Sequence, residues 1–467
     1  MNGSGDTMPR VGSTTSTSST SSLRAIAHIK NMAINQRAKR ILTEDPNRLN
    51  KKEAFWSKRH HTHEDDPKDG DATIFSSAVA LAATCVGTGL FALPYAFDTA
   101  GFGLGAVLLV LFAGISIFSS YAICKCADWT GTYAYEEVLE EAFGRRGAWI
   151  MEVFVIWLLI GAMTSALVVV RGAVTYVVFY SGLSEHWQST LVLLDVGCVA
   201  TPLSWMQSPN SLRHTNTLAV ACTLIVSFLV MYRGTVCTGV AIDKWVERPS
   251  ANFTFQAVQV IPIVMLSLGC QVQVPAMYGE LHQKSLFRMV VVLLSSGGSC
   301  IIMYVGVAFF GILASQGCNS TDWVPIKGSV LQNFPTGDPY ALAMQLIMAV
   351  TLTLVFPMLC LPCRSTLNSL LFGHSEDWHH VHRAGETLFI VVVTWFLSGA
   401  DGDLASVFSF TGATAGAAIC YIIPLACFLR LRRAQSADIQ KSSRIEAVLC
   451  CVILACLVPL VIFLRVV

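Results

Sequence analysis

Charged residues are scarce in this sequence. Asp, Glu, Lys and Arg make up only 13% of its 467 residues, whereas 54% are hydrophobic. An ordinary soluble domain carries about 25% charged residues, and the mean hydropathy here is +0.58. This scarcity excludes a soluble globular protein and predicts the lipid bilayer as a partner. The net charge of +1 gives no indication of nucleic-acid binding.

The sequence also lacks the short motifs of common enzyme sites. It contains no Walker A loop, no G-x-S-x-G and no H-E-x-x-H. Most of its 16 cysteines, such as Cys85 and Cys420, lie in apolar runs, where thiols behave as small hydrophobic groups. We therefore expect neither an enzyme nor a bound metal or cofactor.

The first 72 residues differ from the rest of the chain. A Ser/Thr/Gly-rich tract at residues 12–22 is followed by a basic stretch, and the apolar core of a signal peptide is missing. Such a composition cannot bury enough apolar surface to fold. We interpret residues 1–72 as a largely disordered cytoplasmic tail and residues 73–467 as the membrane domain.

From residue 73 onward, long apolar segments alternate with short polar breaks. A bilayer core about 30 Å thick requires roughly 20 helical residues. Two of the candidate segments, 189–206 and 384–399, are short, so the count could also be ten or nine. We predict an all-α integral membrane protein with eleven transmembrane helices, at residues 73–97, 102–124, 148–177, 189–206, 215–232, 255–280, 287–314, 340–362, 384–399, 404–429 and 446–465.

Loop charges predict the orientation of the chain. With a cytoplasmic N-terminus, the outer loops hold only Arg233, Lys244, Arg248 and Lys327, while the inner loops hold most other basic residues. Cytoplasmic loops are enriched in positive charge in this way. The odd helix count then places the C-terminus outside. We expect the plasma membrane, with a lysosome-like organelle as the alternative.

Two further features fall in the loops assigned to the outside. Asn252 and Asn319 each begin an N-x-T sequon, N-F-T and N-S-T respectively. These sequons predict N-linked glycans there. Cys237 and Cys318 are the cysteines of the outer loops, and they could form a disulfide in an oxidising compartment. Two free thiols are the alternative, which the sequence leaves open.

The first and sixth segments each carry an interruption near the middle. Residues 84–90 read TCVGTGL, with Pro94 a turn later, and residues 267–271 read SLGCQ between Pro262 and Pro275. Backbone polar groups in a bilayer must be satisfied internally, and matching interruptions in two halves indicate an inverted-repeat transporter. Close helix packing by small residues is the alternative.

An unwound helix offers free N–H groups for a carboxylate and free carbonyls for an ammonium. An amino acid carries both groups, so we predict its site at the two interruptions. We expect no Cβ to be tolerated at the glycines here, because the backbone must approach the carboxylate. The predicted substrate-binding residues are Thr84, Gly87, Thr88, Gly89, Leu90, Ser267, Leu268, Gly269 and Gln271.

Three ionisable residues lie within apolar segments, where such residues suggest function. Glu152 and Arg171 fall near the two ends of the third segment, so they could either reach the interface or line the mouths of a pathway. Asp195 lies about two turns inside the fourth segment and could relay a proton or form an interfacial helix end.

Four motifs, in this order, resemble those of the amino acid/auxin permease family. They are VGTGLFALP at 86–94, PAMYGEL at 275–281, LPCRS at 361–365, and FTGAT at 410–414 followed by Pro424. The resemblance covers nearly all of the membrane part. It implies a LeuT-type fold, in which two inverted repeats of five helices are followed by one extra helix. It also implies amino-acid transport, with Glu280 as a contact of the cytoplasmic gate.

One position departs from the family pattern. The sodium-coupled branch has an Asn four residues before the first glycine of its G-S-G, and here that position is Ala83, before Gly87. This departure favours H⁺ coupling or uniport over Na⁺ coupling. A sodium site from carbonyls near Ala83 and Val86, with the hydroxyl of Thr351 or Thr353, stays an open alternative.

We therefore predict a secondary amino-acid transporter that works by alternating access. A membrane sensor that binds an amino acid and signals without net transport is the main alternative, because the long tail permits it. A channel is a third class, against which the missing pore-loop repeat and charged ring argue.

Overall fold

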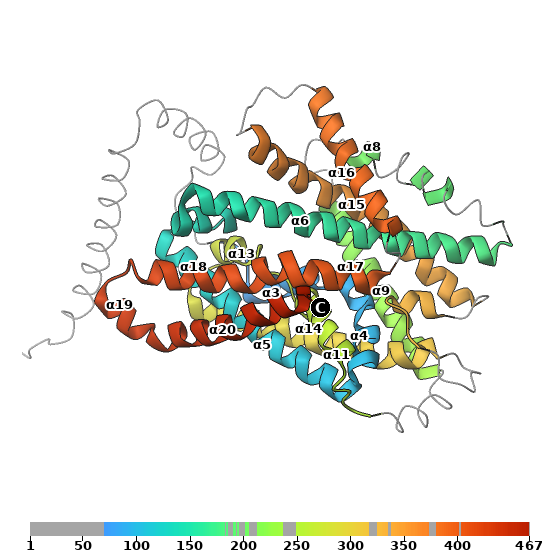
Figure 1. The fold of residues 1–467 in the computed structure, drawn as a ribbon, viewed down its shortest axis with the longest axis horizontal. Coiled ribbons are helices and arrows are strands. Elements are labelled where there is room, and N and C mark those ends of the chain that lie inside the picture. Colours follow the sequence, from blue (N-terminus) through green and yellow to red (C-terminus); the bar gives the residue numbers. More distant parts are fainter. Residues whose placement is uncertain are drawn as a thin grey trace, which may run out of the picture. The chain divides into compact units, whose positions relative to one another are not determined.

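The computed structural model describes residues 70–182, 184, 190–192, 194–195, 201–204, 213–236, 249–316, 325–334, 338–372, 380–400 and 403–466. All of them belong to a compact unit that spans Asp69–Val467. The described part of the chain is almost entirely helical (Figure 1). The predicted tail lies outside these residues, apart from its last three.

Seven stretches of helix are long and apolar enough to cross a membrane. They coincide with seven of the predicted segments, and most of them continue beyond the predicted C-terminal end. Six lie in α5 (Phe102–Thr130), α6 (Tyr135–Tyr180), α9 (Arg213–Val236), α14 (Leu286–Ser315), α15 (Pro339–Phe372) and α20 (Arg444–Val466), and the seventh runs from α17 (Leu404–Thr411) to α18 (Ile423–Arg432).

The first and sixth segments consist of shorter helices. The first comprises α3 (Ile74–Cys85), η1 (Thr88–Phe91) and α4 (Leu93–Ala100), and the sixth comprises α11 (Phe255–Gln259), α12 (Ile261–Ser267) and α13 (Val274–Glu280). The ninth predicted segment lies within α16 (His380–Ala400). Half of the fourth lies outside the described residues, and its described half includes α8 (Thr201–Ser204). An all-helical multi-pass protein is confirmed, whereas the number eleven stays a prediction.

Local sequence signals explain several helix boundaries. Thr73 caps α3 by accepting a hydrogen bond from the Ser76 N–H, and Ser285 caps α14 by accepting one from the Arg288 N–H, as hydroxyl residues commonly do. Gly144 has a φ of 71° and divides α6 into a short amphipathic part and the membrane-spanning part. Smaller elements complete the fold: η4 (Val330–Asn333) and α19 (Ala437–Ser442).

The tenth segment is not a regular α-helix in its middle. Between α17 and α18, Gly412–Gly416 (η5) and Ala418–Ile422 (η6) form π-helical turns. Wider turns of this kind displace carbonyls from their usual intrahelical partners and occur often at functional sites. This stretch packs against α5, α6 and α12, and most of its residues are buried.

The broken segments lie between long helices. The membrane-spanning part of α6 runs alongside α15, and α17 and α18 pack against α6 as well (Figure 1). Helix α14 packs against both helices of the first broken segment, α3 and α4, and also against α5 and α9. The largest apolar core includes Leu90 of η1, Val264 of α12 and Tyr304 of α14. Several residues of the two interruptions, such as Leu90 and Leu268, are therefore covered by other helices.

Candidate functional site

The first segment unwinds at the predicted place. Helix α3 ends at Cys85, and Val86 and Gly87 have non-helical dihedral angles (φ −78°, ψ 88° and φ −132°, ψ −154°) before η1 begins. Pro94 stands in the first turn of α4, where its missing N–H is harmless. The predicted interruption in this segment is confirmed.

The sixth segment unwinds over a slightly longer stretch. Helix α12 ends at Ser267, residues 268–273 are not helical, and α13 begins at Val274 with Pro275 in its first turn. This break also lies at the predicted place. Both breaks release backbone carbonyls at the C-terminal end of a half-helix, which is the negative end of the helix dipole.

The two breaks come into contact through Gly89. A Cβ added at Gly89 would lie 2.8 Å from the Ser267 Oγ and 2.9 Å from the Phe408 Cε1 of α17. At Gly269, an added Cβ would lie 3.1 Å from both the Cys420 Sγ and the Leu266 carbonyl oxygen. The expected intolerance of a side chain therefore has a steric basis at both positions.

Gly87 differs from these two glycines. A Cβ at Gly87 would have no heavy atom within 4 Å, and its φ of −132° is accessible to any residue. Protein packing does not exclude a side chain there. The prediction for Gly87 therefore depends only on a ligand that would occupy the open space.

A tyrosine hydroxyl connects the two breaks. Tyr304 of α14 is fully buried, and its hydroxyl lies 2.7 Å from the carbonyl oxygen of Cys85 and 2.7 Å from that of Ser267. These are the last residues of α3 and α12. Sequence reasoning missed Tyr304; a lone phenol in the apolar seventh segment was the signal that could have indicated it.

Both the nitrogen and the oxygen of the Gln271 side-chain amide form hydrogen bonds with protein groups. Its Nε2 donates to the Ser116 Oγ at 2.7 Å, and its Oε1 accepts from the Cys270 N–H at 2.9 Å. The Ser116 hydroxyl in turn donates to the Leu268 carbonyl at 3.1 Å. Gln271 therefore anchors the sixth-segment break on α5. Ser116 and Ser119, three positions apart, lie on one face of α5. This polar pair in an apolar segment is the signal that could have indicated their role.

The other predicted substrate residues occupy different surroundings. The Thr84 hydroxyl bonds back to the Leu81 carbonyl at 2.8 Å within α3. The Thr88 hydroxyl lies 3.4 Å from the Ser165 Oγ of α6, which adds a third helix to the site. Leu90 and Leu268 are buried in the apolar core. Their roles in substrate binding stay predictions.

The residues considered for ion coupling lie at two places. Ala83 and Val86 lie at the first break. On α15, the Thr353 hydroxyl donates to the Asp195 carboxylate at 3.0 Å, and the Thr351 hydroxyl bonds to the Ile347 carbonyl at 2.6 Å. Thr353 is thus directed toward the fourth segment, and Asp195 has a neutral hydroxyl as its neighbour.

The end of α13 is joined to the start of the membrane domain. The Ala72 N–H donates to the Glu280 carbonyl at 3.2 Å, and the His282 N–H donates to the Ala72 carbonyl at 2.9 Å. This forms an isolated parallel bridge between Ala72 and Leu281. Glu280 contributes its main-chain oxygen to this contact while its carboxylate is exposed. Its role in a gate stays a prediction.

The other two intramembrane charges are paired with polar groups. The Ser369 hydroxyl donates to the Glu152 carboxylate at 3.0 Å, which joins α6 to α15. Arg171 donates to the Ser398 Oγ at 3.0 Å and the Trp395 carbonyl at 3.2 Å, which joins α6 to α16. These contacts give both residues a role in joining helices.

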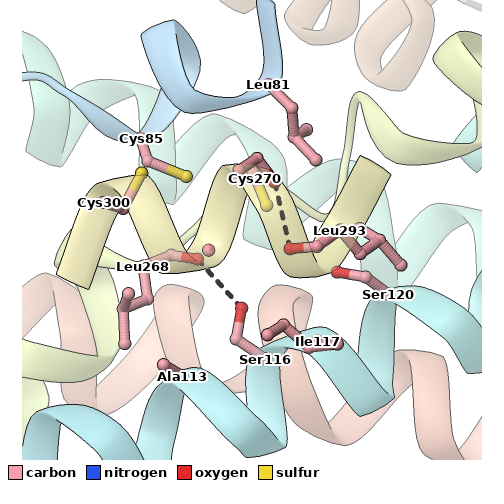
Figure 2. A pocket seen from close by; sticks show the side chains of 12 residues that line it. Leu81, Cys85, Ala113, Ser116, Ile117, Ser120, Leu268, Cys270, Leu293 and Cys300 are labelled. Atoms are coloured by element: carbon pink, nitrogen blue, oxygen red, sulfur yellow. Dashed lines mark hydrogen bonds between the residues drawn. The ribbon is translucent and has the colours of Figure 1, made fainter. Parts of the chain in front are cut away.

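A small cavity borders both breaks. Figure 2 shows Cys85, Cys270 and Cys300 around it, with the Ser116 hydroxyl bonded to the Leu268 carbonyl. The cavity measures about 20 Å³, which is room for about one water molecule. A cavity of this size is too small to hold an amino acid.

The predicted features of the outer loops are only partly described. The Asn252 N–H donates to the Ala100 carbonyl at 2.7 Å, and its side-chain Nδ2 lies 3.5 Å from the Thr99 carbonyl. Asn319, Cys237 and Cys318 lie outside the described residues. The glycans and the disulfide stay predictions.

Comparisons with known proteins agree with this geometry. A family profile described as "Transmembrane amino acid transporter protein" matches residues 70–466. The zebrafish (Danio rerio) "Sodium-coupled neutral amino acid symporter 2" is 25% identical over 400 residues, which cover 80% of this chain and 78% of the relative. The rat (Rattus norvegicus) "Solute carrier family 38 member 10" is 25% identical over 73% of this chain but only 31% of its own length.

A solved structure shares the fold. The structure titled "Inward facing conformation of Mhp1" aligns with a TM-score of 0.56 at 11% identity, and the alignment covers 85% of this chain and 92% of that one. At this identity the likeness shows the fold alone. It agrees with the LeuT-type architecture that the sequence motifs predicted.

Proposed function

Because the chain belongs to the transmembrane amino acid transporter protein family, we propose that it is a secondary transporter that carries an amino acid across the membrane by alternating access. The substrate lies between the two breaks, at residues 84–90 and 267–271. The single observation that supports this site is the meeting of two unwound helices at Gly89 and Ser267, because such half-helices offer free backbone groups to both ends of an amino acid.

The small cavity beside the breaks supports a mechanism with movement. It has room for about one water molecule, so substrate entry requires the helices that surround it to separate. Transporters of this architecture move one group of helices against another around a fixed site. Alternating access then follows from opening the contacts on one side while those on the other side stay closed.

The coupling ion is a separate question. Ala83 in place of Asn led us to predict H⁺ coupling or uniport, whereas the zebrafish relative is named sodium-coupled. The comparison does not support the preference for H⁺, so both ions enter the test. Asp195 beside the Thr353 hydroxyl is the membrane carboxylate that a proton-coupled mechanism would use.

A flux assay in proteoliposomes tests the proposal. Purified protein is reconstituted, and uptake of radiolabelled amino acids is measured under an imposed H⁺ gradient, an imposed Na⁺ gradient, or neither. Saturable uptake with counterflow supports a transporter, and the gradient that drives accumulation identifies the ion. Binding without flux would identify a sensor instead, and non-saturating conductance would identify a channel.

A further inference from the structure

Three thiols from three different segments converge at the small cavity beside the breaks. Cys85 ends α3, Cys270 lies in the sixth-segment break, and Cys300 stands on α14. All three are free cysteines that border the cavity (Figure 2). The Cys85 thiol lies within hydrogen-bonding reach of both other thiols, and the Cys300 Sγ lies 3.9 Å from the Ala82 carbonyl oxygen. Cys85 is therefore the member that the other two sulfurs share as a neighbour.

The cavity offers these thiols to a small polar molecule. It has room for about one water molecule, and the hydroxyl residues Ser116, Ser120 and Ser296 also line it. The Ser120 hydroxyl is buried and has no hydrogen-bond partner among the described residues, so a small polar molecule in the cavity would satisfy it. Cys85 and Cys270 are only half-buried. Hydrogen peroxide, which is only slightly larger than water, has the size and polarity that this cavity accepts.

We propose that the cavity is an oxidation site, at which hydrogen peroxide converts Cys85 and either Cys270 or Cys300 into a reversible disulfide. One sulfur attacks a peroxide oxygen; the S–O bond forms, the O–O bond breaks, and the departing hydroxide takes the thiol proton and leaves as water. The second sulfur then attacks the sulfenic sulfur; the S–S bond forms, the S–O bond breaks, and the hydroxyl takes the second thiol proton and leaves as water. Peroxide is thus reduced to water while the two thiols are oxidised. An external thiol reverses the reaction by exchange.

The disulfide has a direct consequence for movement. Cys85 is the last residue of the first half-helix, so a bond from its sulfur attaches the first break either to the sixth-segment break or to α14. The present contacts between these elements are non-covalent and can open. Substrate entry requires the helices around the cavity to separate, and a covalent bond across the cavity opposes this separation. The arrest of transport therefore rests on the proposed function, whereas the oxidation itself does not.

A second pair of thiols serves as a matched control. Cys126 of α5 and Cys427 of α18 are also within hydrogen-bonding reach of each other, and the Cys427 Sγ lies 4.0 Å from the Val138 carbonyl oxygen. Both cysteines are buried, and neither lines the small cavity. The two groups of thiols share their closeness but differ in access. Their comparison separates oxidation through the cavity from a general oxidation of neighbouring cysteines.

Peptide mapping of the unaltered protein tests the oxidation site. Reconstituted protein is treated with hydrogen peroxide, unfolded, alkylated and digested without reduction, and the linked peptides are identified by mass spectrometry. We expect Cys85 linked to Cys270 or to Cys300, with Cys126 and Cys427 still alkylated. Either link supports the site and identifies the partner. The absence of a Cys85 disulfide, or equal oxidation of Cys126 and Cys427, would refute it. This readout requires neither a variant nor transport.

Uptake by Cys85→Ala and Cys126→Ala tests the arrest. Each rate is expressed relative to that of the same protein before oxidation, so a change in basal uptake does not affect the comparison. Peroxide should abolish most uptake by the unaltered protein and by Cys126→Ala, and dithiothreitol should restore it, whereas Cys85→Ala should keep its uptake. Undiminished uptake by protein that carries the mapped disulfide, or equal inhibition of Cys85→Ala, would overturn the arrest. A failure of the proposed transport function would be seen separately, as absent uptake by the unaltered protein before oxidation.

Discussion

Gly87 and Gly89 stand two positions apart in the same break, but only Gly89 is enclosed by protein atoms. The pair therefore separates packing from ligand contact. We expect Gly89→Ala to lower the free energy of unfolding by about 1–3 kcal/mol, the usual cost of overpacking, and to reduce uptake. We expect Gly87→Ala to retain the melting temperature and yet reduce uptake, because its Cβ enters the space assigned to the substrate.

Thermal unfolding and uptake of the two variants check this expectation together. Equal melting temperatures for Gly89→Ala and the unaltered protein would contradict the close approach of η1 and α12. Wild-type uptake by Gly87→Ala would show that the substrate does not occupy the open space beside Gly87. This result would leave the close contact at Gly89 unchallenged.

At the scale of single residues, the sequence predicted where the two helix breaks lie better than which side chains contact them. The G-T-G and S-L-G-C-Q strings marked the two breaks because each combines glycine, a poor helix former, with a proline close by in the same segment. The side chains that complete the site, Tyr304, Ser116 and Ser165, come from three other helices. A hydrophobic segment in a bilayer has little amphipathic pattern, so the sequence does not show which of its faces meets a neighbour.

At the scale of the element, the π-helical stretch of the tenth segment depends on hydroxyls from other helices. The Ser119 hydroxyl donates to the Cys420 carbonyl at 2.6 Å, and the Tyr135 hydroxyl donates to the Ile419 carbonyl. These donors compensate for intrahelical bonds that wider turns disturb. The sequence predicted a helix here but not its irregular middle, which is formed together with its neighbours.

Ser119→Ala tests this dependence. The change leaves the buried Cys420 carbonyl without this donor, and we expect it to lower the free energy of unfolding by about 1–3 kcal/mol. Ser295→Ala is the matched control, because Ser295 is exposed on α14 and its hydroxyl bonds within its own helix. Thermal unfolding in detergent measures both. Equal melting temperatures would show that the π-helical turns need no external donor.

At the scale of the whole molecule, loop charges predict a cytoplasmic N-terminus and, with an odd number of helices, an external C-terminus. The multi-pass architecture is confirmed, and the orientation stays a prediction. Epitope tags at both ends, probed on intact and permeabilised cells, should show the C-terminal tag accessible from outside and the N-terminal tag only after permeabilisation. Accessibility of both tags from the same side would contradict the odd count.

The same orientation predicts modifications of the outer loops. In a host that glycosylates, we expect Asn252→Gln and Asn319→Gln each to remove one glycan, seen as a step in glycosidase-sensitive mass. Cys237 and Cys318 should appear as one linked peptide pair in non-reducing mass spectrometry. Finding both thiols alkylatable in folded protein would exclude the disulfide, and unmodified asparagines would argue against an external position of these loops.

The parallel bridge between Ala72 and Leu281 has a mechanical consequence. Two backbone hydrogen bonds attach the chain just before α3 to the end of α13, so a force applied upstream of Gly70 acts on both broken segments and not on α3 alone. Anything that pulls on the chain before Gly70 would load α3 and α13 at the same time.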